Sequence, residues 1–403
     1  MTAHGATIDE DAEVRSPQFD LLRRFIAGDL AELRVVLALA VIWIVFYAQE
    51  PRFLSSVNLS NLVLQTTAVG LVSIGIVLVL LLGEIDLSVG AVSGLCAAIM
   101  AVLNVQHGWS PYLAIAAAVL AGTAIGLFQG TVFTRFAVPS FVVTLAGLLA
   151  WPGAQLKVLG ETGTVNLNDP KILGLTSTFY SDTVGWIMAL VAIGVYAALA
   201  LRARQSRVSQ GLSAQQLGIV VLRIGLVTVT ILVAVWVLND DRGVPLAALI
   251  LVGFCLFFFY ITTRTTFGRH IFAVGGNTEA SRRAGINVDG IKIAVFTLAS
   301  TLAAAGGILA ASRLLAVNQD SGGGDLLLLA IAGPVIAGTS LFGGRGAVWT
   351  ALLGALVIGS IANGMDLLAL QSSVKFMVTG AVLLLAVIID AIARQQRQAA
   401  GRI

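Results

Sequence analysis

The feature that most constrains the fold of this chain is a succession of about twelve apolar stretches, separated by short polar segments. Most are close to the length of about 20 residues that a helix needs to cross a bilayer. Because lipid offers no hydrogen-bond partner to an exposed backbone, each stretch is expected to be helical. The predicted fold class is all-α, a polytopic transmembrane bundle of about 10–12 spans with some broken or re-entrant helices. The stretches cover residues 33–48, 60–83, 87–106, 112–134, 139–159, 183–201, 216–238, 245–263, 291–312, 326–341, 347–366 and 373–391.

The composition agrees with a membrane location. Of the 403 residues, 58% are apolar and 11% are charged, and a soluble domain carries about twice that charged fraction. The mean hydropathy is +0.94. The 43 glycines, against 8 prolines, suit helices that pack closely in lipid. We therefore expect an integral membrane protein without a soluble globular domain.

No pattern of catalytic or metal-binding residues is visible. Cys96 and Cys255 fall inside apolar stretches, and His4, His107 and His270 are far apart in the sequence. The motifs HExxH, CxxC and GxSxG are absent, as is the GxxxxGK[ST] loop that binds nucleotide phosphates. We expect no catalytic site, no metal, no cofactor and no nucleic-acid partner, and we expect no hydrolysis of nucleotide by this chain.

The distribution of basic residues predicts the orientation. If both termini are cytoplasmic and the spans alternate, 17 of the 24 basic residues lie inside and 6 outside, with Arg223 within a span. Cytoplasmic loops are enriched in Lys and Arg, so both termini and residues 264–290 are predicted to be cytoplasmic. The inner set is Arg15, Arg23, Arg24, Arg34, Arg135, Arg202, Arg204, Arg207, Arg264, Arg269, Arg282, Arg283, Lys292, Arg345, Arg394, Arg397 and Arg402; the outer set is Arg52, Lys157, Lys171, Arg242, Arg313 and Lys375.

The polar ends and the apolar middle divide the chain into three parts. Residues 1–30 are predicted to be a cytoplasmic tail. They are not predicted to be a secretion signal, because acidic residues such as Asp9 and Glu13 stand where such a signal would be basic. Residues 31–392 are predicted to be the transmembrane domain, and residues 393–403 a second cytoplasmic tail.

Residues 264–290 are a long polar stretch that contains residues suited to start and stop a short helix. Asn277 is suited to cap the helix start and Glu279 to its positive end. Arg282 and Arg283 suit the opposite end, and Gly285 suits a left-handed stop. A helix of about two turns does not persist alone in water. We therefore interpret the stretch as a docking element, and the alternative is a solvated connector.

A second informative segment, Gly83–Gly90, places Glu84 and Asp86 between two apolar stretches. Charged groups at membrane depth usually face a cavity or a partner, and broken helices expose polar backbone to a transported solute. The alternative is an interfacial turn with both acids in water, or Asp86 as an N-cap for the span that begins at Leu87.

A similar glycine-rich break occurs over residues 338–346, where Arg345 is more simply a positive-inside anchor than a substrate contact. Several apolar stretches also contain isolated polar side chains. Such side chains either bond sugar hydroxyls or link helices to one another, and linking is the commoner role. They are Gln65, Asn104, Gln129, Arg223, Asn363 and Asp366.

Three motifs together, GEIDLSVGA (83–91), TFGRHIFAVGGNTEASRRAGINV (266–288) and AGTSLFGGRGAVWTALLGALVIGSIANGM (337–365), resemble the permease subunits of bacterial ABC-type monosaccharide importers. The branch is the one that serves ribose, xylose, galactose and autoinducer-type sugars. The resemblance covers roughly residues 55–392, and length and the segment after residue 200 are most similar to xylose permeases. Shorter members have about ten spans, so residues 183–238 contain an added pair.

The resemblance implies partners and a division of labour. A periplasmic sugar-binding protein delivers the sugar, two permease copies form the path in the membrane, and a separate ATPase subunit supplies energy. The cytoplasmic loop 264–290 is the expected ATPase-coupling loop. Its matching residues are Gly268, Arg269, Gly275, Gly276, Asn277, Glu279, Ala280 and Gly285.

This chain departs from the family pattern at several positions. Leu327 and Leu329 stand where relatives usually carry acidic residues, and Ala337 replaces a usual glycine. Pro334 is unusual at its place, and Glu84 stands where many relatives have glycine. These differences fall outside the coupling loop. They mean that the substrate-contacting positions of relatives do not carry over directly to this chain.

The resulting hypothesis is a permease subunit of an ATP-driven importer in the inner membrane, which translocates xylose or a related pentose. Because a sugar is uncharged, amides, hydroxyls and backbone groups are expected along its path. The candidates are Glu84, Asp86, Ser88 and Asn363. The first alternative is a proton-coupled secondary transporter that uses Glu84 or Asp86. The second, a membrane-embedded enzyme, is disfavoured because no catalytic set is present.

Overall fold

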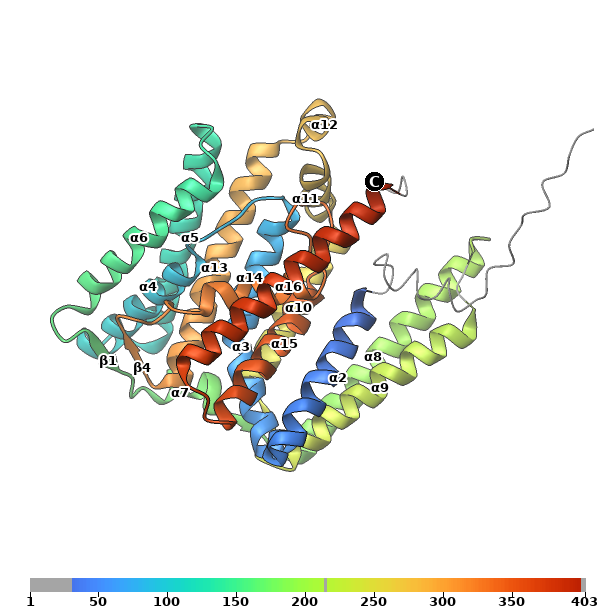
Figure 1. Cartoon of the computed structure of the whole chain (residues 1–403), viewed down its shortest axis with the longest axis horizontal. Helices are drawn as coiled ribbons and strands as arrows, with labels where there is room; N and C mark the ends of the chain where they lie inside the picture. Colours follow the sequence, from blue (N-terminus) through green and yellow to red (C-terminus); the bar gives the residue numbers. More distant parts are fainter. Residues whose placement is uncertain (1–30, 214–215, 400–403) are drawn as a thin grey trace, which may run out of the picture.

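The computed structural model describes residues 31–213 and 216–399, which fold into a bundle of long helices (Figure 1). Each of the twelve predicted apolar stretches contains one helix, so the predicted polytopic all-α fold class is confirmed. These helices are α2 (Ala31–Gln49), α3 (Ser56–Leu81), α4 (Val89–Ala101), α5 (Pro111–Arg135), α6 (Ser140–Leu159), α8 (Asp182–Ser209), α9 (Leu217–Asn239), α10 (Leu246–Arg264), α13 (Val288–Leu314), α14 (Leu326–Ile336), α15 (Trp349–Leu367) and α16 (Ser372–Ala399).

The helices differ in whether they can cross a bilayer alone. Within the described residues, nine helical segments are long and apolar enough to do so. Helix α14 has only 11 residues, about 16 Å at the usual rise per residue, which is roughly half of a bilayer core. The predicted stretch 326–341 is thus a broken helix, and the chain resumes as α15 only at Trp349.

Several short elements lie mostly outside the predicted spans, and apart from the short helix in the polar stretch they were not predicted from the sequence. Two antiparallel two-stranded sheets join distant segments, with Val165 opposite Val317 in one and Tyr180 opposite Val244 in the other. Strands this short leave no periodic signal in the sequence. The elements are η1 (Pro51–Leu54), η2 (Val102–Gln106), β1 (Thr164–Asn166), α7 (Pro170–Ser177), β2 (Phe179–Tyr180), β3 (Val244–Pro245), α11 (Thr266–Gly276), α12 (Thr278–Arg283) and β4 (Ala316–Asn318).

Helices α3 and α13 form the centre of the bundle because small residues let their neighbours approach closely. A Cβ placed on Gly75 of α3 would lie 2.9 Å from the Cα of Ala299 in α13. A Cβ on Gly126 of α5 would lie 2.5 Å from the carbonyl oxygen of Phe296. Such close backbone contact gives dispersion energy where lipid offers no hydrophobic driving force between helices.

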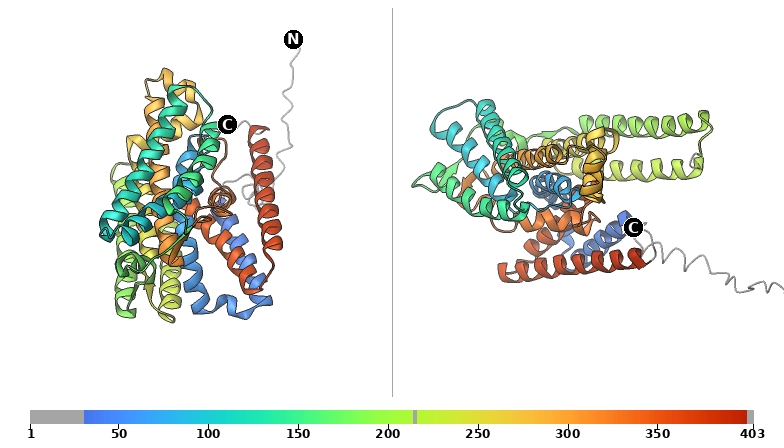
Figure 2. Two further views of the ribbon diagram at one scale, coloured as in Figure 1. Left: turned by 90° about the vertical axis from the view of Figure 1, so that its left-hand side faces the viewer. Right: turned by 90° about the horizontal axis from the view of Figure 1, so that it is seen from above.

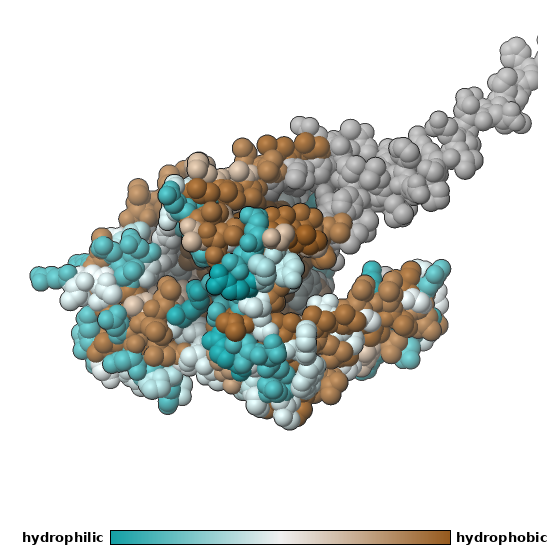
Figure 3. All heavy atoms as spheres, turned by 60° about the horizontal axis from the view of Figure 1, so that its bottom comes forward, coloured by the Kyte–Doolittle hydropathy of each residue, from teal (hydrophilic) through white to brown (hydrophobic). Residues whose placement is uncertain are grey.

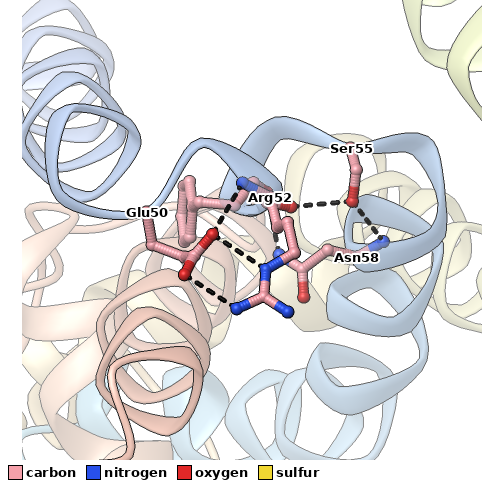
Figure 4. Close-up of polar contacts among 5 residues, drawn as sticks. Glu50, Arg52, Ser55 and Asn58 are labelled. Carbon is pink, nitrogen blue, oxygen red and sulfur yellow. Dashed lines mark hydrogen bonds and ion pairs between the residues drawn. The ribbon is translucent and has the colours of Figure 1, made fainter.

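A polar elbow joins α2 to α3 (Figure 4). The Glu50 carboxylate accepts from the Arg52 backbone N–H at 3.1 Å and from its Nε and Nη2 at 2.9 Å each. These bonds lower the pKa of Glu50 to about 2, so the carboxylate is ionised at neutral pH. Ser55 then caps α3, and the Asn58 amide donates to the Phe53 carbonyl at 2.8 Å. The elbow therefore fixes the turn between the two helices with local bonds.

The ends and the sides of the molecule differ in polarity. The elbow lies at one end and α12 at the opposite end (Figure 1). Viewed toward the elbow end, hydrophilic residues gather at the centre and hydrophobic residues dominate the flanks (Figure 3). This distribution suits a protein whose flanks face lipid and whose ends face water.

Helices α8 and α9 form a hairpin that extends away from the bundle (Figures 1 and 2). Asn239 Nδ2 donates to the Asp182 carbonyl at 3.3 Å and joins the two helices at the elbow end. The predicted N-terminal tail, residues 1–30, lies outside the described residues. Of the predicted C-terminal tail, residues 393–399 continue α16, and residues 400–403 lie outside the description.

Candidate functional site

The short helix predicted in the polar stretch is present as α12. The Asn277 Oδ1 accepts from the Ala280 N–H at 2.9 Å, which makes Asn277 the N-cap. Glu279 lies in the first turn and bonds Arg283 in the last turn at 3.2 Å. Gly285 has φ +83°, the left-handed conformation that ends the helix. The caps read from the sequence are therefore confirmed, and the exposed face of α12 is polar.

A second helix, α11, precedes α12 and was not predicted. Its N-cap is Thr265, whose Oγ1 accepts from the Gly268 N–H at 3.2 Å. Ile271 and Val274 on one face are buried in the core, with Phe267 packed beside them. These positions follow the spacing i, i+4, i+7, which is the periodic signal that would have revealed the helix. The eight predicted coupling-loop residues therefore lie on α11, on α12 and at their ends: Gly268, Arg269, Gly275, Gly276, Asn277, Glu279, Ala280 and Gly285.

Three glycine-containing segments meet backbone to backbone where α11 ends. The Gly344 N–H donates to the Leu81 carbonyl oxygen at 2.9 Å. A Cβ on Gly275 would lie 1.8 Å from that same oxygen, and a Cβ on Gly343 would lie 2.8 Å from the Gly83 nitrogen. Gly83, Gly343 and Gly344 all have positive φ. We call this contact the glycine junction; it joins the polar loop to both interrupted segments of the bundle.

Next to the glycine junction, Glu84 is paired rather than solvated. Its Oε1 lies 2.5 Å from Lys292 Nζ at the start of α13, and its Oε2 accepts from Ser140 Oγ of α6 at 2.6 Å. The Glu84 and Lys292 side chains are only 19% and 18% exposed. The alternative of an acid in headgroup water is therefore wrong for Glu84. Neither partner was identified from the sequence, although an isolated Lys at the edge of an apolar span commonly has an acidic partner.

Asp86 lies deeper, with 1% of its surface exposed. Its Oδ1 accepts from the backbone N–H and the hydroxyl of Ser88, at 2.8 and 2.7 Å. The turn therefore orders the residues just before α4, which begins at Val89 rather than Leu87. The solvated-turn alternative is wrong for Asp86 as well.

Ser88 connects this turn to a buried polar group between α4, α5 and α6. Its hydroxyl lies 3.0–3.1 Å from the amide of Gln129. Gly147 leaves room there, since a Cβ on it would lie 2.4 Å from Gln129 Nε2 and 2.7 Å from Trp151 Nε1. Among the described residues, Asp86 Oδ2 and Trp151 Nε1 are buried without a hydrogen-bond partner. Trp151 was not identified from the sequence, because one aromatic residue in an apolar stretch carries no signal.

Asn363 belongs to a different part of the molecule. Its Oδ1 accepts from Asn58 of α3 at 2.8 Å, and its Nδ2 donates to Gln65 at 3.3 Å. The amides link α15 to α3. The four predicted pathway residues thus form three groups: Glu84 with Lys292, Asp86 with Ser88, and Asn363 with Asn58.

The segment before α14 also enters the bundle. Gln155 Nε2 of α6 donates to the carbonyl oxygens of Asn318 and Ser321 at 2.8 and 3.0 Å. A Cβ on Gly90 of α4 would lie 2.6 Å from the Gly322 carbonyl oxygen. The starts of α4 and α14 are therefore close to each other. Within the residues that the structure describes, no group of three or more His, Cys, Asp or Glu side chains suits a metal ion.

Comparison with known proteins identifies the family. The family model described as branched-chain amino acid transport system / permease component matches residues 58–387. The xylose transport system permease protein XylH of Escherichia coli is 36% identical over 363 residues, which are 90% of this chain and 92% of that protein. XylH of Haemophilus influenzae is 36% identical over 88% of this chain and 95% of its own.

A ribose permease is also similar. The ribose import permease protein RbsC of Escherichia coli is 31% identical over 91% of this chain and 96% of its own length. No solved structure matches the chain. The resemblance inferred from the three motifs is therefore confirmed over nearly the whole bundle. This chain belongs to the family of transport-system permease components that also includes the xylose and ribose permeases.

Proposed function

We propose that this chain is the membrane-spanning permease subunit of an ATP-driven importer that translocates a monosaccharide, xylose or a related pentose, across the inner membrane. Relatives named as xylose permeases align with 90% of the chain, which supports the substrate class. The observation that carries the ATP-driven part is the glycine junction. It connects the end of α11, which leads into the exposed, capped helix α12, to both places where the bundle is interrupted.

In this proposal, the ATPase subunit docks on α12 and moves α11 with it. Helix α11 is packed into the core through Ile271 and Val274, so it moves as a rigid lever rather than bending as a loop. At the end of α11 next to α12, a Cβ on Gly275 would lie 1.8 Å from the Leu81 carbonyl oxygen, which accepts a hydrogen bond from the Gly344 N–H. Displacement of α11 then shifts both interrupted segments together. ATP states that dock differently on α12 would change the ratio of inward-open to outward-open forms.

The sugar pathway is proposed to include Glu84, Asp86, Ser88 and Asn363. Asp86 Oδ2 and Trp151 Nε1 offer an acceptor and a donor near Ser88 and Gln129, a combination that suits a hydroxyl group. Lys292 neutralises Glu84, which is compatible with an uncharged solute. The segments at Gly90, at the start of α4, and at Gly322, before α14, are where polar backbone would meet the sugar.

The remaining parts of the chain have proposed locations and partners. Residues 31–392 form the transmembrane permease domain, 264–290 the cytoplasmic coupling loop, and 1–30 and 393–403 cytoplasmic tails. The chain is multi-pass with both termini inside, and it is not itself an enzyme, since ATP hydrolysis belongs to the ATPase subunit. Its other partners are a periplasmic sugar-binding protein, a second permease copy, which makes a homodimer, and membrane lipid.

The test is co-purification and uptake with a candidate ATPase and binding protein. The variant Glu279→Arg inverts the charge at the start of α12, where Glu279 is 65% exposed. We expect it to reduce ATPase association and xylose-stimulated hydrolysis by more than about tenfold, a loss worth about 1.4 kcal/mol, with normal membrane insertion. Arg135→Gln, an exposed arginine at the end of α5 and outside residues 264–290, serves as the control. Uptake that survives ATP depletion and stops when the proton gradient collapses would instead support a secondary transporter.

A further inference from the structure

The α8–α9 hairpin carries positive charge without any negative charge between its ends. No Asp or Glu occurs between Asp182 and Asp240, whereas four arginines do: Arg202, Arg204, Arg207 and Arg223. Arg202, Arg207 and Arg223 therefore have no acidic side chain near them within the hairpin itself. Arginines beside lipid are costly unless they reach the headgroup region or find a partner.

The hairpin contacts the rest of the bundle mainly at its elbow end. Ser56 Oγ donates to Asp240 at 2.5 Å, and Arg242 Nη2 donates to Asn61 at 2.9 Å. Ala189, Val235 and Leu238 pack there in a small buried cluster. In contrast, none of residues 190–209 or 221–234 is buried, and the far half stands clear of the bundle in Figure 1 and in the right-hand view of Figure 2.

The arginines gather in this far half. Asp182 and Asn239 lie side by side, so depth along each helix can be measured from them at 1.5 Å per residue. On α9, Arg223 is about 24 Å from Asn239. On α8, Arg202 is about 30 Å from Asp182, which places it about one helical turn deeper than Arg223. Arg207 is about 38 Å along. A bilayer core is about 30 Å thick, so the group lies at the far membrane boundary.

The side chains at this boundary have the character of a lipid-binding surface. Arg202, Arg207 and Arg223 are exposed, and none of the described acidic side chains forms an ion pair with any of them. Leucines surround them on the same two helices and are also exposed: Leu199 by 62%, Leu222 by 63% and Leu226 by 61%. Cationic groups above exposed aliphatic groups match a phosphate headgroup above its acyl chains.

We propose that the far half of the α8–α9 hairpin binds anionic phospholipid headgroups. A guanidinium donates two parallel hydrogen bonds to a phosphate, which a neutral side chain cannot do. Basic segments next to a membrane span attract anionic lipid by about fivefold per residue. This proposal rests on the orientation proposed above, with Arg202 and Arg207 on the cytoplasmic side, but it requires neither sugar nor ATPase. An anionic lipid would also hold the protruding hairpin at a fixed depth.

The test compares lipid retention by purified variants in nanodiscs of phosphatidylcholine that contain a minor fraction of phosphatidylglycerol. Bound phosphatidylglycerol is counted by native mass spectrometry. The triple variant Arg202→Gln/Arg207→Gln/Arg223→Gln is expected to retain at least about tenfold less of it. The matched control is Arg52→Gln, an exposed arginine that is already paired with Glu50 at 2.9 Å, for which a change below about twofold is expected.

A second variant separates charge from folding. The triple lysine variant Arg202→Lys/Arg207→Lys/Arg223→Lys keeps the charge and is expected to retain more than half of the phosphatidylglycerol. Equal retention by the glutamine variant and the wild type would overturn the proposal. So would equal losses of phosphatidylcholine and phosphatidylglycerol, or unchanged lipid together with loss of a co-purifying protein. Because the measurement involves no transport, its failure leaves the proposed importer function untouched.

Discussion

At the scale of single residues, the predicted pathway side chains occur in pairs or small groups. Glu84 has Lys292 and Ser140, Asp86 has Ser88, and Asn363 has Asn58. The physical reason is that an unpaired charge or amide away from water costs more free energy than most single contacts supply. A sequence presents each member alone, so only the fold reveals which ones are partners.

The Glu84–Lys292 pair predicts a strong coupling in unfolding experiments. Glu84→Gln or Lys292→Met alone leaves a charge in a mostly buried place and is expected to lower the free energy of unfolding by about 1–3 kcal/mol. The double variant is expected to lose less than the sum of the two. Thermal unfolding of the four proteins in detergent gives the coupling energy. Additive losses would mean that the two side chains do not interact in the folded protein.

The glycine junction predicts opposite tolerance at two adjacent positions. Gly275→Ala introduces a Cβ 1.8 Å from the Leu81 carbonyl oxygen, whereas Gly276→Ala meets nothing within 4 Å. We expect Gly275→Ala to lower stability by about 1–3 kcal/mol, the usual cost of overpacking, and to reduce coupled uptake. Gly276→Ala is expected to keep the wild-type stability. Melting temperatures and uptake are measured for both variants. Equal melting temperatures for Gly275→Ala and Gly276→Ala would contradict the close contact at the glycine junction.

At the scale of elements, the polar stretch 264–290 contains two helices that differ in burial. Helix α11 buries one face in the core, and α12 exposes most of its surface. A helix as short as α12, with six residues, lacks the length for stability of its own. It therefore depends on its caps and on α11, which holds it at the end of the bundle.

The N-cap predicts how α12 responds to substitution. Asn277→Ala removes the acceptor for the Ala280 N–H and is expected to destabilise α12 by about 1 kcal/mol. Hydrogen exchange of the α12 amides should then speed up about fivefold, with little change in α13. Asn277→Ser keeps an acceptor and is expected to restore protection. No difference between the Ala and Ser variants would show that the cap contributes nothing.

At the scale of the whole molecule, the proposed orientation can be tested with introduced cysteines. Both native cysteines, Cys96 and Cys255, are buried, so background labelling should be low. Glu279→Cys lies at the α12 end, and Glu161→Cys lies in the exposed loop after α6. A membrane-impermeant maleimide is expected to label position 161 in whole spheroplasts and position 279 only after lysis. The reverse pattern would invert the topology and remove the coupling proposal.

The sequence by itself determined the polytopic helical class, the twelve helical stretches, the caps of α12 and the family. These features depend on local composition and spacing, since burial in lipid and capping act over one helix or one turn. It missed α11 because that helix was hidden in a polar stretch, although the spacing of Phe267, Ile271 and Val274 contains the signal.

Only the tertiary structure decided the partners. Lys292 lies 208 positions from Glu84, and Asn363 lies 305 positions from Asn58. Leu81, Gly275 and Gly344 come from three separate segments. Contacts between residues so far apart depend on how α3, α13 and α15 pack, and packing is set by the summed shape of many side chains. No single motif encodes that shape, so the glycine junction and the isolated far half of α8–α9 become visible only in the folded chain.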